Sequence, residues 1–131
     1  MPHLTLEYSD NLPAPVDFDA LFARLHEALV EIGSFRLADL KSRAVPQPCF
    51  RIGAGSPESV FVHLTVAILA GRPPAQQQEI GERLLALLKA AFEPAWAGRP
   101  CDVTVELREM RREGYFKTAN ARATSGTGTT P

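Results

Sequence analysis

Pro2-His3-Leu4-Thr5-Leu6-Glu7 at the start of the chain returns near its middle as Val62-His63-Leu64-Thr65-Val66-Ala67. In both stretches apolar side chains alternate with more polar ones, which is typical of a β-strand with one buried face. Two such similar strands predict a duplicated fold, in which each half of the chain begins with a strand.

A helical pattern follows each strand, and in the first half Asp17 is predicted to cap the helix and Gly33 to end it. The apolar residues of this helix recur at helical spacing, as Phe18, Leu21, Phe22, Leu25, Ala28, Leu29 and Ile32. In the second half Gly71-Arg72-Pro73-Pro74 turns the chain into a helix. The apolar residues of that helix are Ile80, Leu84, Leu87, Leu88 and Ala91. Apolar and polar side chains alternate again over residues 37–45 and 102–108, which predicts a second strand in each half.

Two consecutive strand, helix, strand units imply parallel strand pairs with right-handed crossovers. We therefore predict a two-layer α+β fold, in which duplicated β-α-β units form one four-stranded mixed sheet with two helices on one face. The predicted single domain covers residues 1–120, with halves at about 2–45 and 60–109 and a linker at 46–59. Residues 121–131 are rich in Ser, Thr and Gly and are predicted to form a disordered tail.

The composition narrows the classes of function. Fourteen basic and fifteen acidic side chains give a formal net charge of -1, so we expect no general attraction for nucleic acid or anionic membranes, and any anion site must be local. Cys49 and Cys101 lack metal-ligand spacing and are interpreted as reduced thiols. The amino terminus lacks a signal-peptide pattern. We therefore expect a cytoplasmic protein. His3, His26 and His63 lack clustered carboxylate or cysteine partners, so no metal is expected.

Four features of the chain are a strand that starts at Pro2, the duplicated plan, Gly71-Arg72 before the second helix, and Glu109-Met110 leading to Phe116. In these features the chain resembles the tautomerase superfamily. Within it the chain resembles the 5-carboxymethyl-2-hydroxymuconate isomerase family, whose chains are fused and double-length, over about residues 2–120. Each half resembles the smaller 4-oxalocrotonate tautomerases. The resemblance implies a homotrimer that needs no cofactor and acts on a small-molecule carboxylate.

The resemblance also implies a reaction, in which the amino-terminal proline takes a proton from an enol or an activated carbon and returns it to another carbon. The enzyme would be an isomerase that interconverts keto and enol groups of an unsaturated 2-hydroxy or 2-oxo polycarboxylate, 5-carboxymethyl-2-hydroxymuconate from homoprotocatechuate catabolism. Pro2 has a basic secondary amine only once Met1 is removed, and it must be neutral near pH 7. Val62, its counterpart, is internal, so one proline-based site per chain is expected.

Four further residues are candidates for this site. By the resemblance Arg72 is catalytic, since a guanidinium at a helix amino terminus can hold a carboxylate bidentately and stabilise a dienolate. Lys41 stands where the family commonly has an arginine, and it binds a carboxylate only as a point charge. Because successive side chains of a strand point to opposite faces, Lys41 and Arg43 are expected to point away from the helices. They would face either a site across a subunit boundary or solvent. Phe116 matches an aromatic that walls the family's site, although a core or interface position is equally open.

The sequence leaves two other functions open. A terminal proline that is protonated at rest could act as an acid in hydration, dehalogenation or decarboxylation of small unsaturated acids. A catalytically silent trimeric binding module is the second alternative, which Lys41 leaves open because it departs from the family pattern. The sheet face without helices carries mixed side chains, which could be solvated or could meet other subunits.

Overall fold

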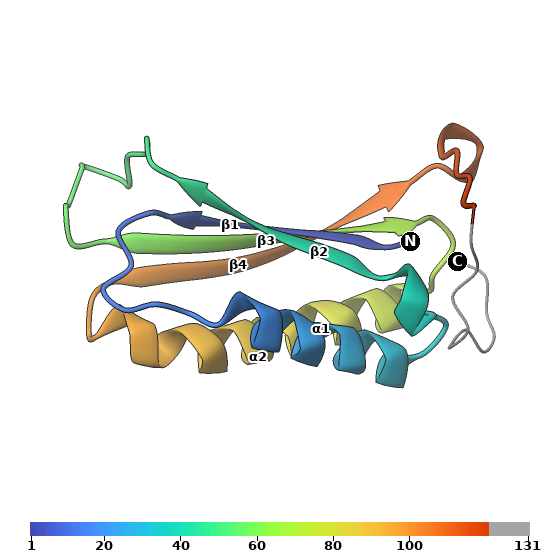
Figure 1. Cartoon of the computed structure of the whole chain (residues 1–131), viewed down its shortest axis with the longest axis horizontal. Helices are drawn as coiled ribbons and strands as arrows, with labels where there is room; N and C mark the ends of the chain where they lie inside the picture. Colours follow the sequence, from blue (N-terminus) through green and yellow to red (C-terminus); the bar gives the residue numbers. More distant parts are fainter. Residues whose placement is uncertain (121–131) are drawn as a thin grey trace.

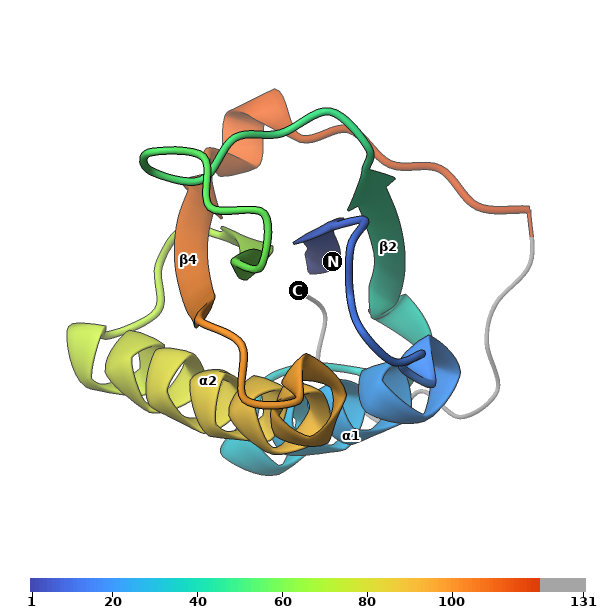
Figure 2. The same cartoon turned by 90° about the vertical axis from the view of Figure 1, so that its left-hand side faces the viewer.

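Four strands and two α-helices form the part of the chain that this computed structural model describes, residues 1–120. The predicted tail at 121–131 lies outside the described residues. In chain order the elements are β1 (His3–Ser9), α1 (Phe18–Ile32), the 3-10 turn η1 (Leu37–Asp39), β2 (Lys41–Gln47), β3 (Val60–Leu69), α2 (Pro74–Trp96), β4 (Cys101–Met110) and the 3-10 turn η2 (Arg112–Gly114). Both helices lie on one face of the sheet, as Figures 1 and 2 show.

The sheet pairs the two copies of the repeated sequence with each other. Its strand order is β2-β1-β3-β4, with β1 parallel to β2, β3 parallel to β4, and β1 antiparallel to β3. Thr5 is the register partner of Thr65, and Leu4 and Leu6 pair with Val66 and Leu64. The two β-α-β halves are therefore related by an approximate twofold axis through the β1-β3 pair, and the predicted four-stranded mixed sheet with two helices on one face is confirmed.

The second strand begins later than its sequence pattern predicts. Alternation predicted a strand over residues 37–45, but Asp39 and Leu40 donate backbone hydrogen bonds to Arg36 and Leu37 and close a 3-10 turn before β2. Alternating polarity cannot distinguish this turn from a strand. β2 then continues through Pro46, which lacks a backbone N–H and is tolerated because β2 is an edge strand.

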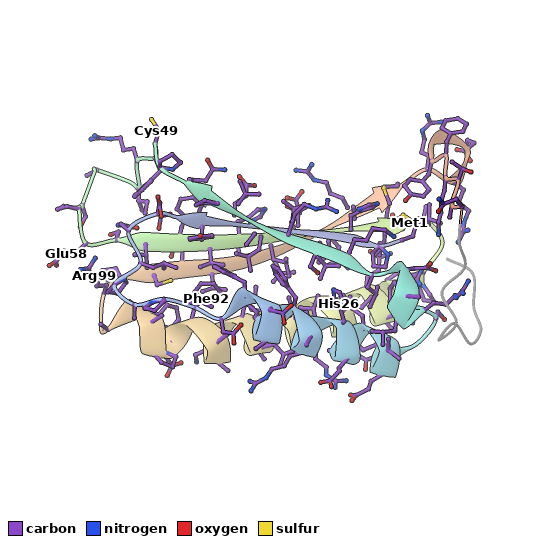
Figure 3. The ribbon with its side chains drawn as sticks, viewed as in Figure 1. Met1, His26, Cys49, Glu58, Phe92 and Arg99 are labelled. Carbon is purple, nitrogen blue, oxygen red and sulfur yellow. The ribbon has the colours of Figure 1, made fainter. Side chains whose placement is uncertain are left out.

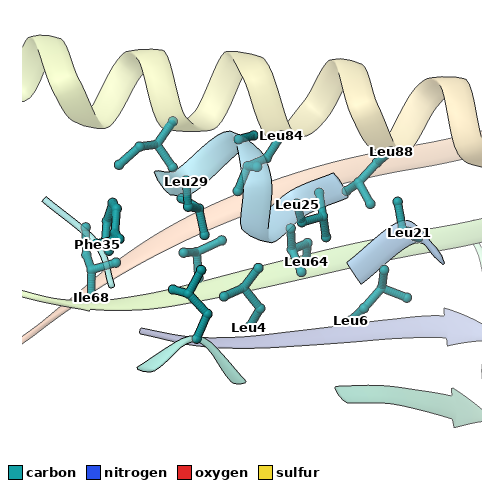
Figure 4. Packing of buried hydrophobic residues seen from close by; sticks show 14 of the residues in the cluster. Leu4, Leu6, Leu21, Leu25, Leu29, Phe35, Leu64, Ile68, Leu84 and Leu88 are labelled. Carbon is teal, nitrogen blue, oxygen red and sulfur yellow. The ribbon is translucent and has the colours of Figure 1, made fainter. Parts of the chain in front are cut away.

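The core lies between the sheet and the helices. Leucines from β1, β3 and both helices interdigitate there, as the close-up in Figure 4 shows. Leu4, Leu25 and Leu84 are each fully buried. Within residues 1–120, neither helix combines the length and apolarity that crossing a bilayer requires.

Two neighbouring leucines of α2 offer a test of this packing. Leu84 is fully buried whereas Leu85 is 41% exposed. Leu84→Ala is expected to lower the free energy of unfolding by about 2–5 kcal/mol because it leaves a cavity in the core. Leu85→Ala, with the same change in helix propensity, should cost less than about 1 kcal/mol. Urea unfolding followed by circular dichroism measures both, and equal losses would contradict this account of the core.

Candidate active site

The predicted site residues gather at one end of the sheet, where β1 and β2 begin and β3 and β4 end. His3 pairs with Lys41 on one side and with Ala67 on the other, and Ala67 pairs with Arg108. Arg72 follows the end of β3 and therefore belongs to the same end. In Figure 1 this end lies at the right, beside the label N.

The amino terminus is buried at this end. Met1 is only 2% exposed, and Figure 3 shows it at the end of the sheet where β1 begins. Its amino nitrogen donates to the carbonyl oxygen of Asp39 at 3.0 Å. The Lys41 ammonium donates to the same oxygen at 3.1 Å. Pro2 is buried too, and its carbonyl oxygen accepts a hydrogen bond from the Lys41 backbone at 3.4 Å.

This environment favours the neutral form of an amine. Burial and the charges of Lys41 and Lys117, opposed in part by Asp39, together lower the pKa of the Met1 amino group to about 6. Both causes penalise the protonated state. The Met1 amino group is therefore mostly unprotonated at neutral pH, which is the state that a base at the amino terminus requires.

Arg72 is held by the connection that follows α1. Its guanidinium lies 3.9 Å from the centroid of the Phe35 ring and donates to the Ser34 carbonyl oxygen at 2.8 Å. Within residues 1–120 no hydrogen-bond partner reaches its buried Nε atom. Burial, and then the charge of Arg112, lowers the pKa of Arg72, but a guanidinium stays charged. A fixed and partly desolvated cation attracts an anion more strongly than a solvated one.

Asp39 organises the other cations of this end. Its buried carboxylate lies 3.3 Å from the Lys117 ammonium and 4.0 Å from Arg36 Nε. The Asp39 carboxylate thus contacts two cations, while the Lys41 ammonium and the amino terminus both donate to the backbone carbonyl oxygen of the same residue. The end of the sheet carries a local excess of positive charge in a chain whose formal net charge is -1, which suits a polyanionic ligand.

The remaining candidates lie at the same end but are less enclosed. Lys41 and Arg43 are exposed on the helix-free face, and Arg43 donates to His3 Nδ1 at 3.0 Å. Phe116 is 87% exposed, so its contact with a substrate stays a prediction. Sequence reasoning did not identify Phe35, which supports Arg72, or Asp39, and neither carries a motif that could have revealed it.

The described residues offer no group of three or more His, Cys, Asp or Glu side chains that could hold a metal ion. What they offer is a buried amine surrounded by cations. A base beside anion-binding groups can remove a proton from a carboxylate substrate and stabilise the enolate that results.

A duplicated β-α-β sheet with a buried amino terminus among cations at one end defines a protein of the tautomerase class. A sequence profile described as 5-carboxymethyl-2-hydroxymuconate isomerase matches residues 2–124. The 5-carboxymethyl-2-hydroxymuconate Delta-isomerase of Escherichia coli is 32% identical over 123 residues, which cover 94% of this chain and 98% of that protein. This chain belongs to the 5-carboxymethyl-2-hydroxymuconate isomerase family.

Solved structures agree with this assignment. A crystal structure of a 5-carboxymethyl-2-hydroxymuconate isomerase from Deinococcus radiodurans R1 superposes with a TM-score of 0.80 at 32% identity, covering 91% of this chain and 90% of that one. A fused 4-OT described as a symmetric trimer gives 0.70 at 20% identity, covering 95% and 97%. The second similarity concerns the fold alone.

Proposed function

We propose that this chain is a cofactor-independent isomerase that moves a proton within an unsaturated 2-hydroxy or 2-oxo polycarboxylate, with 5-carboxymethyl-2-hydroxymuconate as its substrate. Membership of the family supports the reaction type and the substrate. The observation that carries the mechanism is the buried amino terminus beside Lys41 and Lys117, where the pKa of the Met1 amino group is lowered to about 6, and the Pro2 amine would lie beside the same cations once Met1 is removed.

In this mechanism Pro2 is the base once Met1 has been removed. Its neutral secondary amine accepts the proton of the enol hydroxyl, which leaves a dienolate and a prolyl ammonium. The ammonium then returns the proton to a carbon further along the conjugated system. The enol becomes a ketone, the double bonds shift, and the amine is neutral again, so protons balance without another reactant.

The cations bind and polarise the substrate. Arg72 holds one carboxylate and stabilises the negative charge that develops on the dienolate. Lys41 attracts a second carboxylate as a point charge, and Arg43 assists from the neighbouring position on β2. A neutral proline at rest also separates this reaction from hydration, dehalogenation or decarboxylation, which would require a protonated one.

We also propose that the chain works as a homotrimer whose subunits meet at the helix-free face of the sheet. Hydrogen-bonded polar side chains cross that face, including His63 Nδ1 with Thr104 Oγ1 at 2.6 Å. The large exposed side chains Val45 and Phe116 would be covered in such an assembly. Cys49 and Cys101 are free in the structure, which supports a reducing compartment such as the cytoplasm.

The pH dependence of turnover tests this function. With 5-carboxymethyl-2-hydroxymuconate followed by its ultraviolet absorbance, kcat/KM is expected to fall about tenfold per pH unit below the pKa of Pro2. Lys41→Gln should move this limb to higher pH, because loss of a neighbouring cation makes the amine easier to protonate. Lys117→Gln should move it in the same direction by less, since Lys117 has the weaker effect on the terminal amine.

Lys89 provides the control, because it is an exposed lysine on α2. Lys89→Gln should leave the position of the limb unchanged. A profile that stays flat between pH 8 and pH 5, or that rises toward low pH, would show that a neutral amine is not the base.

A further inference from the structure

Three side chains form a hydrogen-bonded row beside the amino terminus. Arg43 Nη2 lies 3.0 Å from His3 Nδ1, and His3 Nε2 lies 3.1 Å from the hydroxyl of Tyr115. The imidazole and the phenol also meet edge to face, with ring centroids 6.2 Å apart. The chemistry proposed above uses Arg43 but neither His3 nor Tyr115.

The direction of these hydrogen bonds follows from the chemistry of Arg43. A guanidinium carries only donors, so His3 Nδ1 must accept and cannot hold a proton. The imidazole is then neutral with its proton on Nε2, which donates to the Tyr115 oxygen. Burial, followed by the charges of Arg43, the amino terminus and Lys41, lowers the pKa of His3, which agrees with a neutral ring.

The Tyr115 hydroxyl must therefore donate its own proton elsewhere. Its oxygen already accepts from His3, and within residues 1–120 the structure gives its O–H no protein acceptor. A half-buried hydroxyl that accepts from His3 and has no acceptor for its own proton among the described residues can donate to an acceptor on a ligand.

The segment that carries Tyr115 is fastened to the end of the sheet where the amino terminus lies. Figure 2 shows the chain after β4 crossing above the sheet toward the β2 side. Lys117, two residues after Tyr115, contacts the buried carboxylate of Asp39 at 3.3 Å, and the carbonyl of Asp39 accepts from Met1. Tyr115 is thus held between two anchors, His3 and Asp39, that both adjoin the proposed base.

We propose that Tyr115 is a further substrate-binding residue, whose hydroxyl donates a hydrogen bond to a carboxylate of the substrate, and that His3 is a positioning residue that fixes the direction of this bond. Arg43 sets the tautomer of His3 and so acts on the substrate through Tyr115. This role is additional to the direct contact with the substrate that is predicted for Arg43. This inference rests on the proposed function, since it needs a polycarboxylate ligand at this end of the sheet.

Tyr115→Phe tests the hydrogen bond with little change of shape. Loss of a hydrogen bond to a charged group should lower kcat/KM by a factor of about 10 to 100, mainly through a higher KM, because the contact is made to the bound substrate as well as to the transition state. Tyr8→Phe is the matched control, since Tyr8 packs against Phe18 away from this end. It should change kcat/KM less than about twofold.

A double-mutant cycle tests the positioning residue. His3→Leu should raise KM in the otherwise unchanged protein, because the Tyr115 hydroxyl can then turn away, but should add little in the Tyr115→Phe background. Additive losses would overturn the role of His3, and a wild-type KM in Tyr115→Phe would overturn the role of Tyr115.

Nitrogen-15 chemical shifts of His3 in the unmodified protein provide a measurement that needs no variant. The Nε2–H tautomer is expected at pH 7, and an Nδ1–H or doubly protonated ring would overturn the proposed direction. An unmodified protein that fails to isomerise 5-carboxymethyl-2-hydroxymuconate would overturn the proposed function together with this inference. If the unmodified protein isomerises this substrate and Tyr115→Phe has the same KM as the unmodified protein, only the role of Tyr115 would be overturned and the proposed function would stand.

Discussion

A protein whose Pro2 nitrogen is blocked is expected to have a kcat/KM about 10²- to 10⁴-fold below that of the chain with a free amino-terminal proline. The nitrogen of an internal proline is an amide without basicity. The primary amine of a retained Met1 cannot replace it, because it stands one residue away and small errors in the position of a base cost large factors in rate.

The structure indicates why processing would also open the site. Met1 is 2% exposed yet lies outside the contiguous apolar cluster of the core. Its side chain fills buried space next to Pro2. Removal of Met1 would vacate this space beside the new amine, with little loss of core packing, and leave room for a substrate.

The experiment compares one preparation before and after cleavage. An amino-terminal extension with a protease site directly before Pro2 keeps the nitrogen blocked, and cleavage frees it, with intact mass reporting each form. The same extension placed at the carboxyl end is the control and should leave kcat/KM unchanged. If the extended protein is as active as the cleaved one, Pro2 is not the base.

The fold could be predicted from the sequence because its signals are local and periodic. Alternation in the two repeated strands and helical spacing in α1 and α2 each fix an element without knowledge of the rest of the chain. The register, in which Thr5 and Thr65 of the two repeated strands pair with each other, was not predicted from the sequence. The start of β2 was missed because a 3-10 turn at Leu37–Asp39 resembles a strand in polarity.

The site was only partly predictable. Resemblance to a family pointed to Pro2, Arg72 and Lys41, and strand order then explains why one end of the sheet carries all three. The groups that tune them were not predictable, because they meet across long separations in sequence. Lys117 reaches Asp39 over 78 residues, and the alternation over residues 37–45 that includes Asp39 gives no sign of this contact.

Arg72→Gln is expected to lower kcat/KM by a factor of about 10² to 10³, the usual loss when a preorganised group that stabilises an oxyanion is removed. Arg72→Lys should recover only part of the activity. An ammonium keeps the charge but lacks the planar fork that grips a carboxylate, and it cannot reproduce the stacked contact with the Phe35 ring.

The loss should fall mainly on kcat if Arg72 stabilises the dienolate, because that charge develops after the substrate has bound. Arg83→Gln is the matched control, an arginine on α2 that pairs with Glu31 on the surface. Exposed pairs of this kind contribute about 0–1 kcal/mol to stability, so its turnover should match that of the unmodified protein. A rise in KM with unchanged kcat in Arg72→Gln would restrict Arg72 to holding the substrate. The charge of the dienolate would then have to be stabilised by Lys41 and its neighbours, because they are the other cations beside the amino terminus.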